Sequence, residues 1–587
     1  MLRLVVVMLL AGAPASLAFA QSSSAYVIRN VTVIDVAAGV ATGPRDVVIS
    51  GRLIERVTEP GKATVPHRAI VIDGRGKYLL PGLIDSHVHI KEGDPLFLFV
   101  AAGVTTVQNM SGRPFHLALR AEVSDGALLG PRIITTGPTT AEAGVTTAEE
   151  VERLVLEQKA LGYNAIKMYG SSRGDMSADA YRTLNDVARR NGLRVVGHAA
   201  RNLPVEAVLA ERQASIDHME EIVYTHRPFA RLLKPYVDLQ FDRATAQTRD
   251  SLMRVAVPDF AHELQPEITA LAESVRRAGL AVTPNLVFFR NIHWMTNDSI
   301  HALMRAPELA YAAPGQRLNW SPMLNNYRNS WGNNLPVVTP YLEAVVELQK
   351  AITFAFHQAG VPIMAGTDSE YLGAQPGFGL HTELELFVGL GMKPIEALQA
   401  ATITSARVMQ IADSVGSIGA GRVADMVLLD ADPLANVSNT RRITGVFRAG
   451  QWLPRATLAT KLDSLSRTYE PVQAALSSFM TALESDGAAA ALAVYRASPR
   501  RELIAKPVER VINSYGYRVL GEKRIKDAIE IFRLNTEAFP NEYNTWDSLA
   551  EAYLEDGNKE VAIRYYRKVL ELRPGDENAT RILKQLE

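Results

Sequence analysis

Two histidines stand two residues apart at the end of an apolar run, in the segment GLIDSHVH. They are His87 and His89. Side chains at positions i and i+2 of a strand point to the same face, so both imidazoles are expected to converge. Imidazole is a common ligand of zinc and similar divalent metals, and the pair would supply half of a metal site. Paired surface histidines also occur by chance, so this interpretation depends on further ligands elsewhere in the chain.

Four more polar residues lie at the ends of later apolar runs. They are Lys167 in NAIKMY, His198 in RVVGH, His218 in SIDH and Asp368 in IMAGTD. Each has a structural explanation by itself, because a lysine can extend to solvent, a histidine can bond within a core and an aspartate can cap a helix. Taken together at one end of a set of strands, they predict an active site.

The elements that would position these residues are short β-branched runs alternating with helical patterns between residues 79 and 412. The runs are LLPGLIDSH, GVTTVQNM, RIITTG, NAIKMYG, LRVVGHA, ASIDHM, LAVTPNLV and VPIMAGTD. Helices are expected between the strands, for example at 147–161, 178–191 and 341–359. Eight strands that alternate with helices predict an α/β fold, a (β/α)8 TIM barrel. A doubly wound open sheet is the alternative. Insertions at 219–262 and 290–339 follow strand ends, so we expect them to form a lid or wall over the active site.

Short alternating strands flank the barrel on both sides, in residues 26–78 and 413–456. Their patterns, such as YVIRNVTVIDV and GRVADMVLLD, predict antiparallel strands that come together from both ends of the barrel. We therefore expect a small composite β-sandwich domain beside the barrel.

The remaining residues, 457–587, show helical patterning with a period of 34. The matching pairs are Leu520 and Leu554, Ala528 and Ala562, Ile529 and Ile563, Phe532 and Tyr566, and Pro540 and Pro574. This all-α domain resembles tetratricopeptide repeats, with a degenerate third copy at 470–500. Such repeats bind peptides or other proteins, although they could equally pack on the barrel or pair two subunits of a homo-oligomer.

Composition and the first residues limit the partners and the location. The chain has 62 Lys+Arg and 63 Asp+Glu, so bulk charge does not favour nucleic acid. Residues 1–20 have an early Arg3, an apolar run and Ala18-Phe19-Ala20 before Gln21, which is typical of a cleaved signal peptide. No later apolar stretch is long enough for a membrane span, and with 0 Cys no disulfide can form. We expect a periplasmic or secreted protein.

The order of the polar residues resembles the amidohydrolase superfamily, in particular its imidazolonepropionase-like and Xaa-Pro dipeptidase-like branch. The motifs that carry the likeness are GVTTV, AIKMY, GHA, IDHMEE, AGTDS and SIGAGRVADMVLLDADPL, and it extends over residues 26–452. Asn109, in VQNMSG, departs from the pattern because members usually have an aspartate there. This change would affect a supporting hydrogen bond but no ligand.

The resemblance implies two divalent metal ions, with zinc as the expected metal, and a bridging residue. The implied ligands are His87, His89 and Asp368 for one metal, His198 and His218 for the other, and a carboxylated Lys167 between them. A hydroxide shared by the metals would attack the substrate, with Asp368 as the proton shuttle. The implied reaction is hydrolysis of C–N amide bonds in dipeptides or N-acyl amino acids.

Two alternatives stay open at this point. The chain could hydrolyse cyclic amides or lactones, or it could be a non-catalytic binding protein that works through its helical repeats. Two further residues are candidates for substrate binding: Tyr224, six residues after His218, and His381, in the motif LHTELELFV.

Overall fold

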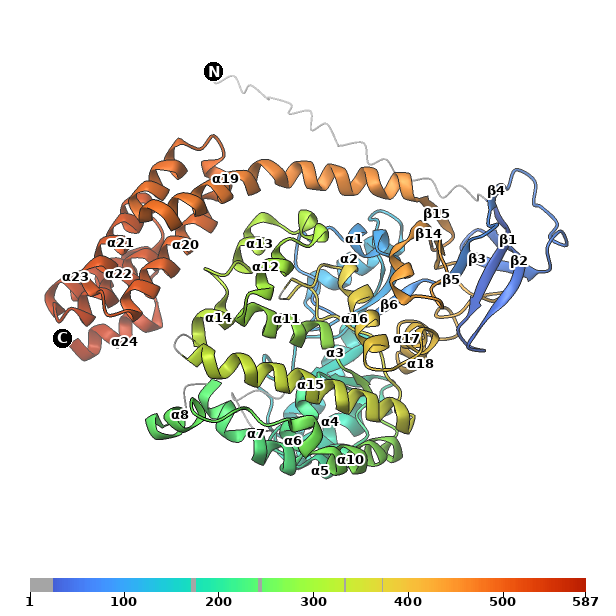
Figure 1. The fold of residues 1–587 in the computed structure, drawn as a ribbon, viewed down its shortest axis with the longest axis horizontal. Coiled ribbons are helices and arrows are strands. Elements are labelled where there is room, and N and C mark those ends of the chain that lie inside the picture. Colours follow the sequence, from blue (N-terminus) through green and yellow to red (C-terminus); the bar gives the residue numbers. More distant parts are fainter. Residues whose placement is uncertain (1–24, 170–175, 241–244, 332–333, 372, 587) are drawn as a thin grey trace, which may run out of the picture.

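The computed structural model describes residues 25–169, 176–240, 245–331, 334–371 and 373–586. The segment expected to be a signal peptide, residues 1–20, lies outside them. Figure 1 shows a central barrel, a β-sheet domain at one side and a group of helices at the other, connected across the top by the long helix α19.

The central domain is a closed barrel of parallel strands. Its assigned strands are β6 (Leu83–Val88), β7 (Val104–Asn109), β8 (Arg132–Thr135), β9 (Ala165–Met168), β10 (Arg194–Gly197), β11 (Ser215–Asp217) and β12 (Ala281–Thr283). Parallel bridges join Thr136 to Ala165, Val282 to Ile363 and Val88 to Ser369, so residues 363–369 complete the ring as the eighth strand. The Ala214 amide donates to the carbonyl of Val195, which links β10 to β11. This closure excludes the open sheet and confirms the barrel.

The first expected strand, LLPGLIDSH, is in fact two strands in two domains. Residues Tyr78–Pro81 form β5 of the flanking sheet, and β6 begins at Leu83. Gly82 lies between the two strands. A Cβ at this position would lie 2.1 Å from the Oγ1 atom of Thr105, so only glycine allows the backbone to pass this close to Thr105. An apolar run that crosses a domain boundary has the same pattern as one long buried strand.

The flanking domain is one sheet built from both ends of the barrel. Its strands are β1 (Tyr26–Asp35), β2 (Val40–Ser50), β3 (Leu53–Thr58), β4 (Ile70–Asp73), β5, β13 (Met426–Leu429), β14 (Ile443–Arg448) and β15 (Gln451–Pro454). The order is β15-β14-β13-β5-β1-β2-β3, with β4 also on β1. The expectation of antiparallel strands is wrong for β4, which pairs with β1 in parallel. Strand β5 pairs with β1 in parallel and with β13 in the antiparallel direction. The separate sheets of a sandwich stay a prediction.

Helices cover the barrel and fill both insertions. The barrel helices are α1 (Phe97–Ala101), α2 (Pro114–Ser124), α3 (Ala148–Leu161), α4 (Ala178–Arg190), α5 (Val205–Ala210), α10 (Gln265–Ala278), α15 (Leu335–Ala359), α16 (Phe378–Gly389), α17 (Pro394–Ala400) and α18 (Ile403–Val408). The first insertion holds α6 (Met219–Thr225), α7 (Arg227–Gln240), α8 (Ala246–Leu252) and α9 (Phe260–Glu263). The second holds α11 (Leu286–Thr296), α12 (Ser299–Met304), the 3-10 helix η1 (Pro307–Tyr311), α13 (Pro314–Asn319) and α14 (Asn326–Trp331). Helix α15 begins six residues before the expected 341, because its first-turn proline is compatible with a helix start.

The C-terminal residues form a separate helical unit. Its helices are α19 (Arg455–Ala497, kinked at Gly487), α20 (Arg501–Gly521), α21 (Ile525–Ala538), α22 (Tyr543–Glu555), α23 (Lys559–Leu572) and α24 (Glu577–Leu586). Leu318 and Leu324 of the second insertion are buried in the apolar core of this unit, together with Phe479 and Ile504. The unit is therefore docked on the barrel's second insertion.

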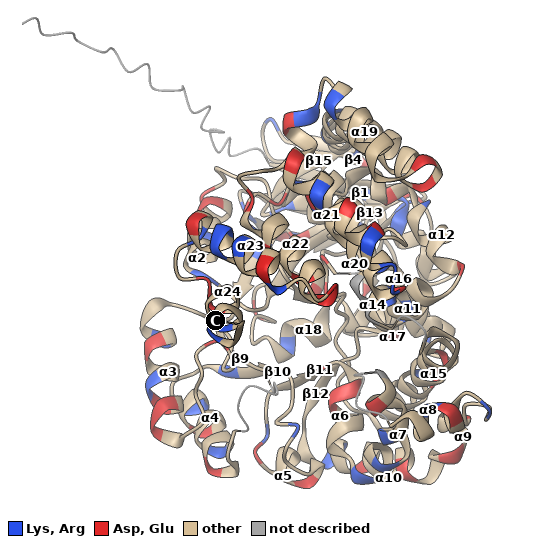
Figure 2. Cartoon of the chain, turned by 90° about the vertical axis from the view of Figure 1, so that its left-hand side faces the viewer, with Lys and Arg blue, Asp and Glu red and all other residues tan. Residues whose placement is uncertain are grey.

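Basic and acidic residues alternate along the ribbon in Figure 2, including the C-terminal helices α20–α24. This agrees with the formal net charge of −1 for the whole chain. Among the described residues, no helix has the length and apolar character needed to cross a bilayer.

Candidate metal centre

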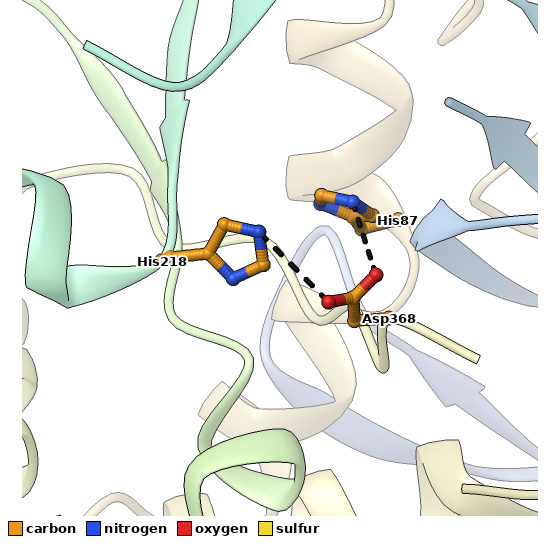
Figure 3. Close-up of side chains that lie close together, drawn as sticks. All are labelled: His87, His218 and Asp368. Carbon is orange, nitrogen blue, oxygen red and sulfur yellow. Dashed lines mark ion pairs between the residues drawn. The ribbon is translucent and has the colours of Figure 1, made fainter. Parts of the chain in front are cut away.

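Three donor atoms converge at the mouth of the barrel, from the first and eighth strands. The Nε2 atoms of His87 and His89 lie 3.3 Å apart. The Oδ1 atom of Asp368 is 3.4 Å from the first and 3.2 Å from the second. This carboxylate also approaches His218, whose Nε2 lies 4.0 Å from Oδ2, so Asp368 lies between two imidazoles (Figure 3). The expected convergence of His87 and His89 is thus present.

The charge state of this cluster suits a cation. Burial, followed by the neighbouring charge of Lys167, lowers the pKa of His87 well below its ordinary value. Burial also lowers the pKa of His218, so both imidazoles are neutral and keep a lone pair for a ligand bond. Burial acts to raise the pKa of Asp368, but interactions with His87, His89 and Lys167 together outweigh burial, and the pKa lies below the ordinary value. Neutral imidazoles around an ionised carboxylate are a typical donor set for a divalent metal.

The spacing of the donors fits a metal as well. A tetrahedral ion with ligand bonds of ~2.1 Å has ligand atoms about 3.4 Å apart, which is close to the separations of His87, His89 and Asp368. His87, His218 and Asp368 are all buried, with one donor atom each inside a 4.8 Å group. The buried Nδ1 atom of His218 has no hydrogen-bond partner in the parts of the chain that the structure describes. The residues present therefore fit a metal ion.

Lys167 lies beside this cluster at the end of β9, almost fully buried. Its Nζ is 3.5 Å from the Oδ2 atom of Asp217, and the same oxygen lies 3.1 Å from the Nδ1 atom of His87. Gly197 makes room for it, because a Cβ there would be 2.5 Å from the lysine's Cδ. The lysine side chain therefore has a fixed path from β9 to the centre of the barrel.

His198 completes the expected set on the other side of His218. The two rings lie 5.0 Å apart between centroids. The Nδ1 atom of His198 is 2.6 Å from the Oε1 atom of Glu221, which directs Nε2 away from this bond. The same carboxylate accepts a hydrogen bond from the Nε of Arg201 at 2.9 Å. Burial acts to raise the pKa of Glu221, but interactions with His198 and Arg201, which include hydrogen bonds from both, outweigh burial and lower that pKa to about 2.

Asp85 holds the backbone beside Asp368 in place through hydrogen bonds from Thr367. Its Oδ2 accepts a hydrogen bond of 2.7 Å from the hydroxyl of Thr367, next to Asp368. Burial raises the pKa of Asp85 to about 7. Asn109, the departure from the family pattern, accepts from the Ile90 amide at 2.8 Å and so holds the backbone just after His89.

The two candidates for substrate binding lie in different surroundings. Tyr224 is on α6, and the guanidinium of Arg201 lies 4.6 Å from its ring centroid. Arg201 also bonds Glu221, so it connects Tyr224 to the Glu221–His198 pair. His381 is buried on α16, where its Nδ1 is 2.9 Å from the hydroxyl of Thr440 and its ring also bonds the backbone of Ala102. Both partners lie outside the cluster of proposed ligands, and a role of His381 in substrate binding stays a prediction.

Sequence reasoning missed Asp85, Asp217, Arg201 and Glu221. Asp85 could have been found, because it precedes His87 by two residues and shares the face of the His87–His89 pair. Glu221 follows His218 by three residues on α6, but its bond to His198 crosses from another strand. Asp217 likewise depends on Lys167, fifty residues earlier in the chain. Neither contact has a local pattern.

The closed barrel and the imidazoles and carboxylates at its strand ends define the class of protein: a barrel enzyme with a candidate metal centre. Comparison with known proteins agrees. The model of the Amidohydrolase family matches residues 98–453, more than half of the chain. The chain is 26% identical to an imidazolonepropionase of Symbiobacterium thermophilum over 404 residues, 66% of this chain and 81% of the relative.

Solved structures share the fold. A bottromycin amidohydrolase superposes with a TM-score of 0.58 at 22% identity, over 78% of this chain and 94% of that one. A Xaa-Pro dipeptidase with methionine bound in its active site superposes with a TM-score of 0.51 at 18% identity, over 73% and 100%. The chain belongs to the Amidohydrolase family, and it is a hydrolytic enzyme.

Proposed function

We propose that this protein is a binuclear metal-dependent hydrolase that cleaves C–N amide bonds of dipeptides or N-acyl amino acids. The observation that carries the proposal is the convergence of His87, His89 and Asp368 at 3.2–3.4 Å, with His218 on the far side of the same carboxylate. His87, His89 and Asp368 would hold one ion. His198 and His218 would hold the other, with a carboxylated Lys167 between them.

When bound, two divalent cations such as Zn²⁺ lower the pKa of a water molecule to near neutrality and polarise the substrate carbonyl. The chain itself supplies the group that transfers the proton, the carboxylate of Asp368. The ionised carboxylate of Asp368 accepts the proton that the water loses as its oxygen attacks the carbonyl carbon. The same proton then passes from Asp368 to the amide nitrogen as the C–N bond breaks, which yields a carboxylic acid and an amine; the acid then loses its proton to solvent at neutral pH.

A substrate panel and a metal analysis test this proposal. We expect the purified protein to contain two metal equivalents, to lose activity with a chelator and to regain it with Zn²⁺, and to hydrolyse dipeptides or N-acetyl amino acids. The panel should include a cyclic amide such as hydantoin, because the imidazolonepropionase relative makes ring opening the second candidate. Metal well below two equivalents and no amide hydrolysis would contradict the proposal.

The role of Lys167 has its own variant. Lys167→Ala should bind the second ion weakly, because no anionic bridge remains to hold two cations together, and short carboxylic acids should restore part of the activity. The exposed Lys159→Ala on α3 is the matched control. Two tight metals and full turnover in Lys167→Ala would show that the lysine does not bridge.

We further propose that the C-terminal helices are tetratricopeptide-like. The helices α21 and α23 begin at Ile525 and Lys559, and α22 and α24 begin at Tyr543 and Glu577, so both pairs are offset by 34 residues as the repeat requires. Burial of Leu318 in their core favours docking on the barrel as their role, over binding of a separate peptide or a second subunit.

We also propose that the protein is exported to the periplasm or the medium. Sequencing the N-terminus of protein recovered from the cell envelope tests this, and Gln21 is the expected first residue. An intact Met1 would contradict export.

A further inference from the structure

Two tyrosines at the mouth of the barrel keep a large part of their surface exposed. Tyr169 directly follows β9 and is 42% exposed, and Tyr371 follows Asp368 by three residues and is 43% exposed. Neither ring is used by the proposed mechanism. Large exposed rings beside buried polar groups are typical of ligand sites, because they offer apolar contact where the substrate must enter.

Each tyrosine packs on a different candidate ligand. The ring centroids of Tyr169 and His198 are 4.5 Å apart, and those of Tyr371 and His89 are 5.1 Å apart with an edge-on angle of 72°. His89 and His198 belong to the two proposed metal positions, so the tyrosines flank the centre from both sides.

Both rings stand on backbone that is held in place. The Tyr169 amide donates to the hydroxyl of Thr140 at 3.1 Å. The Tyr371 amide donates to the carbonyl of Asp368 at 3.0 Å, and the side chain of Gln316 donates to the neighbouring carbonyl of Glu370 at 2.8 Å. Rigid rings lose little entropy when a ligand binds between them.

The surroundings of Tyr371 favour a flat, uncharged group over an anion. Lys91 Nζ lies 5.7 Å from its ring centroid, but the buried carboxylate of Glu370 is only 3.1 Å from that ammonium and compensates its charge. On the other side of the centre, the ring of Phe288 lies 5.8 Å from the ring of His218 and adds a third aromatic wall.

We propose that Tyr169 and Tyr371 form an aromatic clamp that selects amides with a planar aromatic group beside the scissile bond. This inference rests on the proposed amide hydrolysis for its substrate class. Offset or edge-on contacts between rings favour an aromatic ligand over an aliphatic one of similar size, by roughly 2–10-fold for each ring.

Kinetics with matched substrates is the first test. The wild-type kcat/KM should be higher for N-acetyl-L-phenylalanine or N-benzoyl-L-alanine than for N-acetyl-L-leucine, and the better of the two shows on which side of the amide the ring lies. Tyr169→Ala and Tyr371→Ala should each lose this preference, because kcat/KM should fall more for the aromatic substrates than for N-acetyl-L-leucine. The Phe substitutions should keep the preference, and Tyr517→Ala, a part-exposed tyrosine on α20, is the control.

Binding measured by calorimetry separates the clamp from the reaction. Benzohydroxamate and acetohydroxamate both bind metals, but only the first has an aromatic ring. Wild type should bind benzohydroxamate at least 5-fold more tightly than acetohydroxamate. Both alanine variants should lose most of this affinity ratio when compared at equal metal content. A ring-dependent ratio without any amide turnover would keep the clamp and contradict the proposed function. An equal affinity for both hydroxamates in wild type, or a ratio that survives both alanine substitutions, would overturn the clamp.

Discussion

The Nδ1 atom of His198 lies 2.6 Å from the Oε1 atom of Glu221, a residue of the helix that follows His218. Because Glu221 is ionised and also bonds Arg201, it fixes the imidazole tautomer with the proton on Nδ1. The lone pair of His198 is then on Nε2, where a metal could use it. A carboxylate behind a ligating histidine orients the ring and increases its basicity.

Glu221→Gln should therefore weaken metal binding. We expect a loss of metal affinity of about 10–100-fold, because the amide orients His198 less strongly and can select the wrong tautomer. Titration of apoprotein with Zn²⁺ against a competing chelator measures this directly. Glu220→Gln is the matched control. Glu220 lies beside Glu221 on α6 and also pairs with Arg201, but it does not bond His198. Equal Zn²⁺ affinity in Glu221→Gln and wild type would show that His198 needs no such support.

A second buried carboxyl predicts a dependence of stability on pH. Glu383 accepts hydrogen bonds from the amides of Leu286 and Val287 at the start of α11, and burial raises its pKa from 4.5 to about 8. The folded protein therefore binds more protons than the unfolded chain between these values, and this residue's contribution to stability falls as pH rises through that window.

Glu383→Gln cannot titrate, so its free energy of unfolding relative to wild type should increase from pH 5 to pH 8, by at most ~1.4 kcal/mol per pH unit. Urea unfolding of both proteins at pH 5, 6.5 and 8 measures the difference. Glu385→Gln, on the same helix and partly exposed, controls for the loss of a carboxylate. A constant difference across this range would mean that Glu383 is already ionised in the folded protein.

The docking of the C-terminal unit predicts how it responds to a small cavity. Leu318 of α13 is 5% exposed and belongs to the core of that unit, so Leu318→Ala should destabilise it by about 2–5 kcal/mol. Leu503→Ala, on the exposed side of α20, should change stability by less than about 0.5 kcal/mol. Limited proteolysis and thermal unfolding can follow the unit, while metal content should not change. Identical behaviour of the two variants would mean that the α13 contact does not hold the unit in place.

The sequence could predict the barrel and the six residues of the candidate centre, because each residue ends an apolar strand and parallel strands of a barrel end at one face. It could not place the side chains that depend on contacts between distant segments. Asp217 acquires its role only beside Lys167, and Glu221 only beside His198. The motif around His381 located its helix but not the direction of the ring, which faces Thr440. The run through Gly82 hid a domain boundary because both of its halves are buried.

The central claim is that Asp368 moves the proton in a metal-dependent amide hydrolysis, and Asp368→Asn tests it most directly. Asparagine keeps an oxygen that could hold a metal but removes the basic carboxylate. We expect most of the metal to stay, while hydrolysis of an N-acetyl amino acid falls by about 10²–10⁴-fold and hydrolysis of an activated ester, whose leaving group needs no proton, falls less. Metal content and both rates should be measured on the same preparation. A metal-replete Asp368→Asn with near-normal amide hydrolysis would contradict the account.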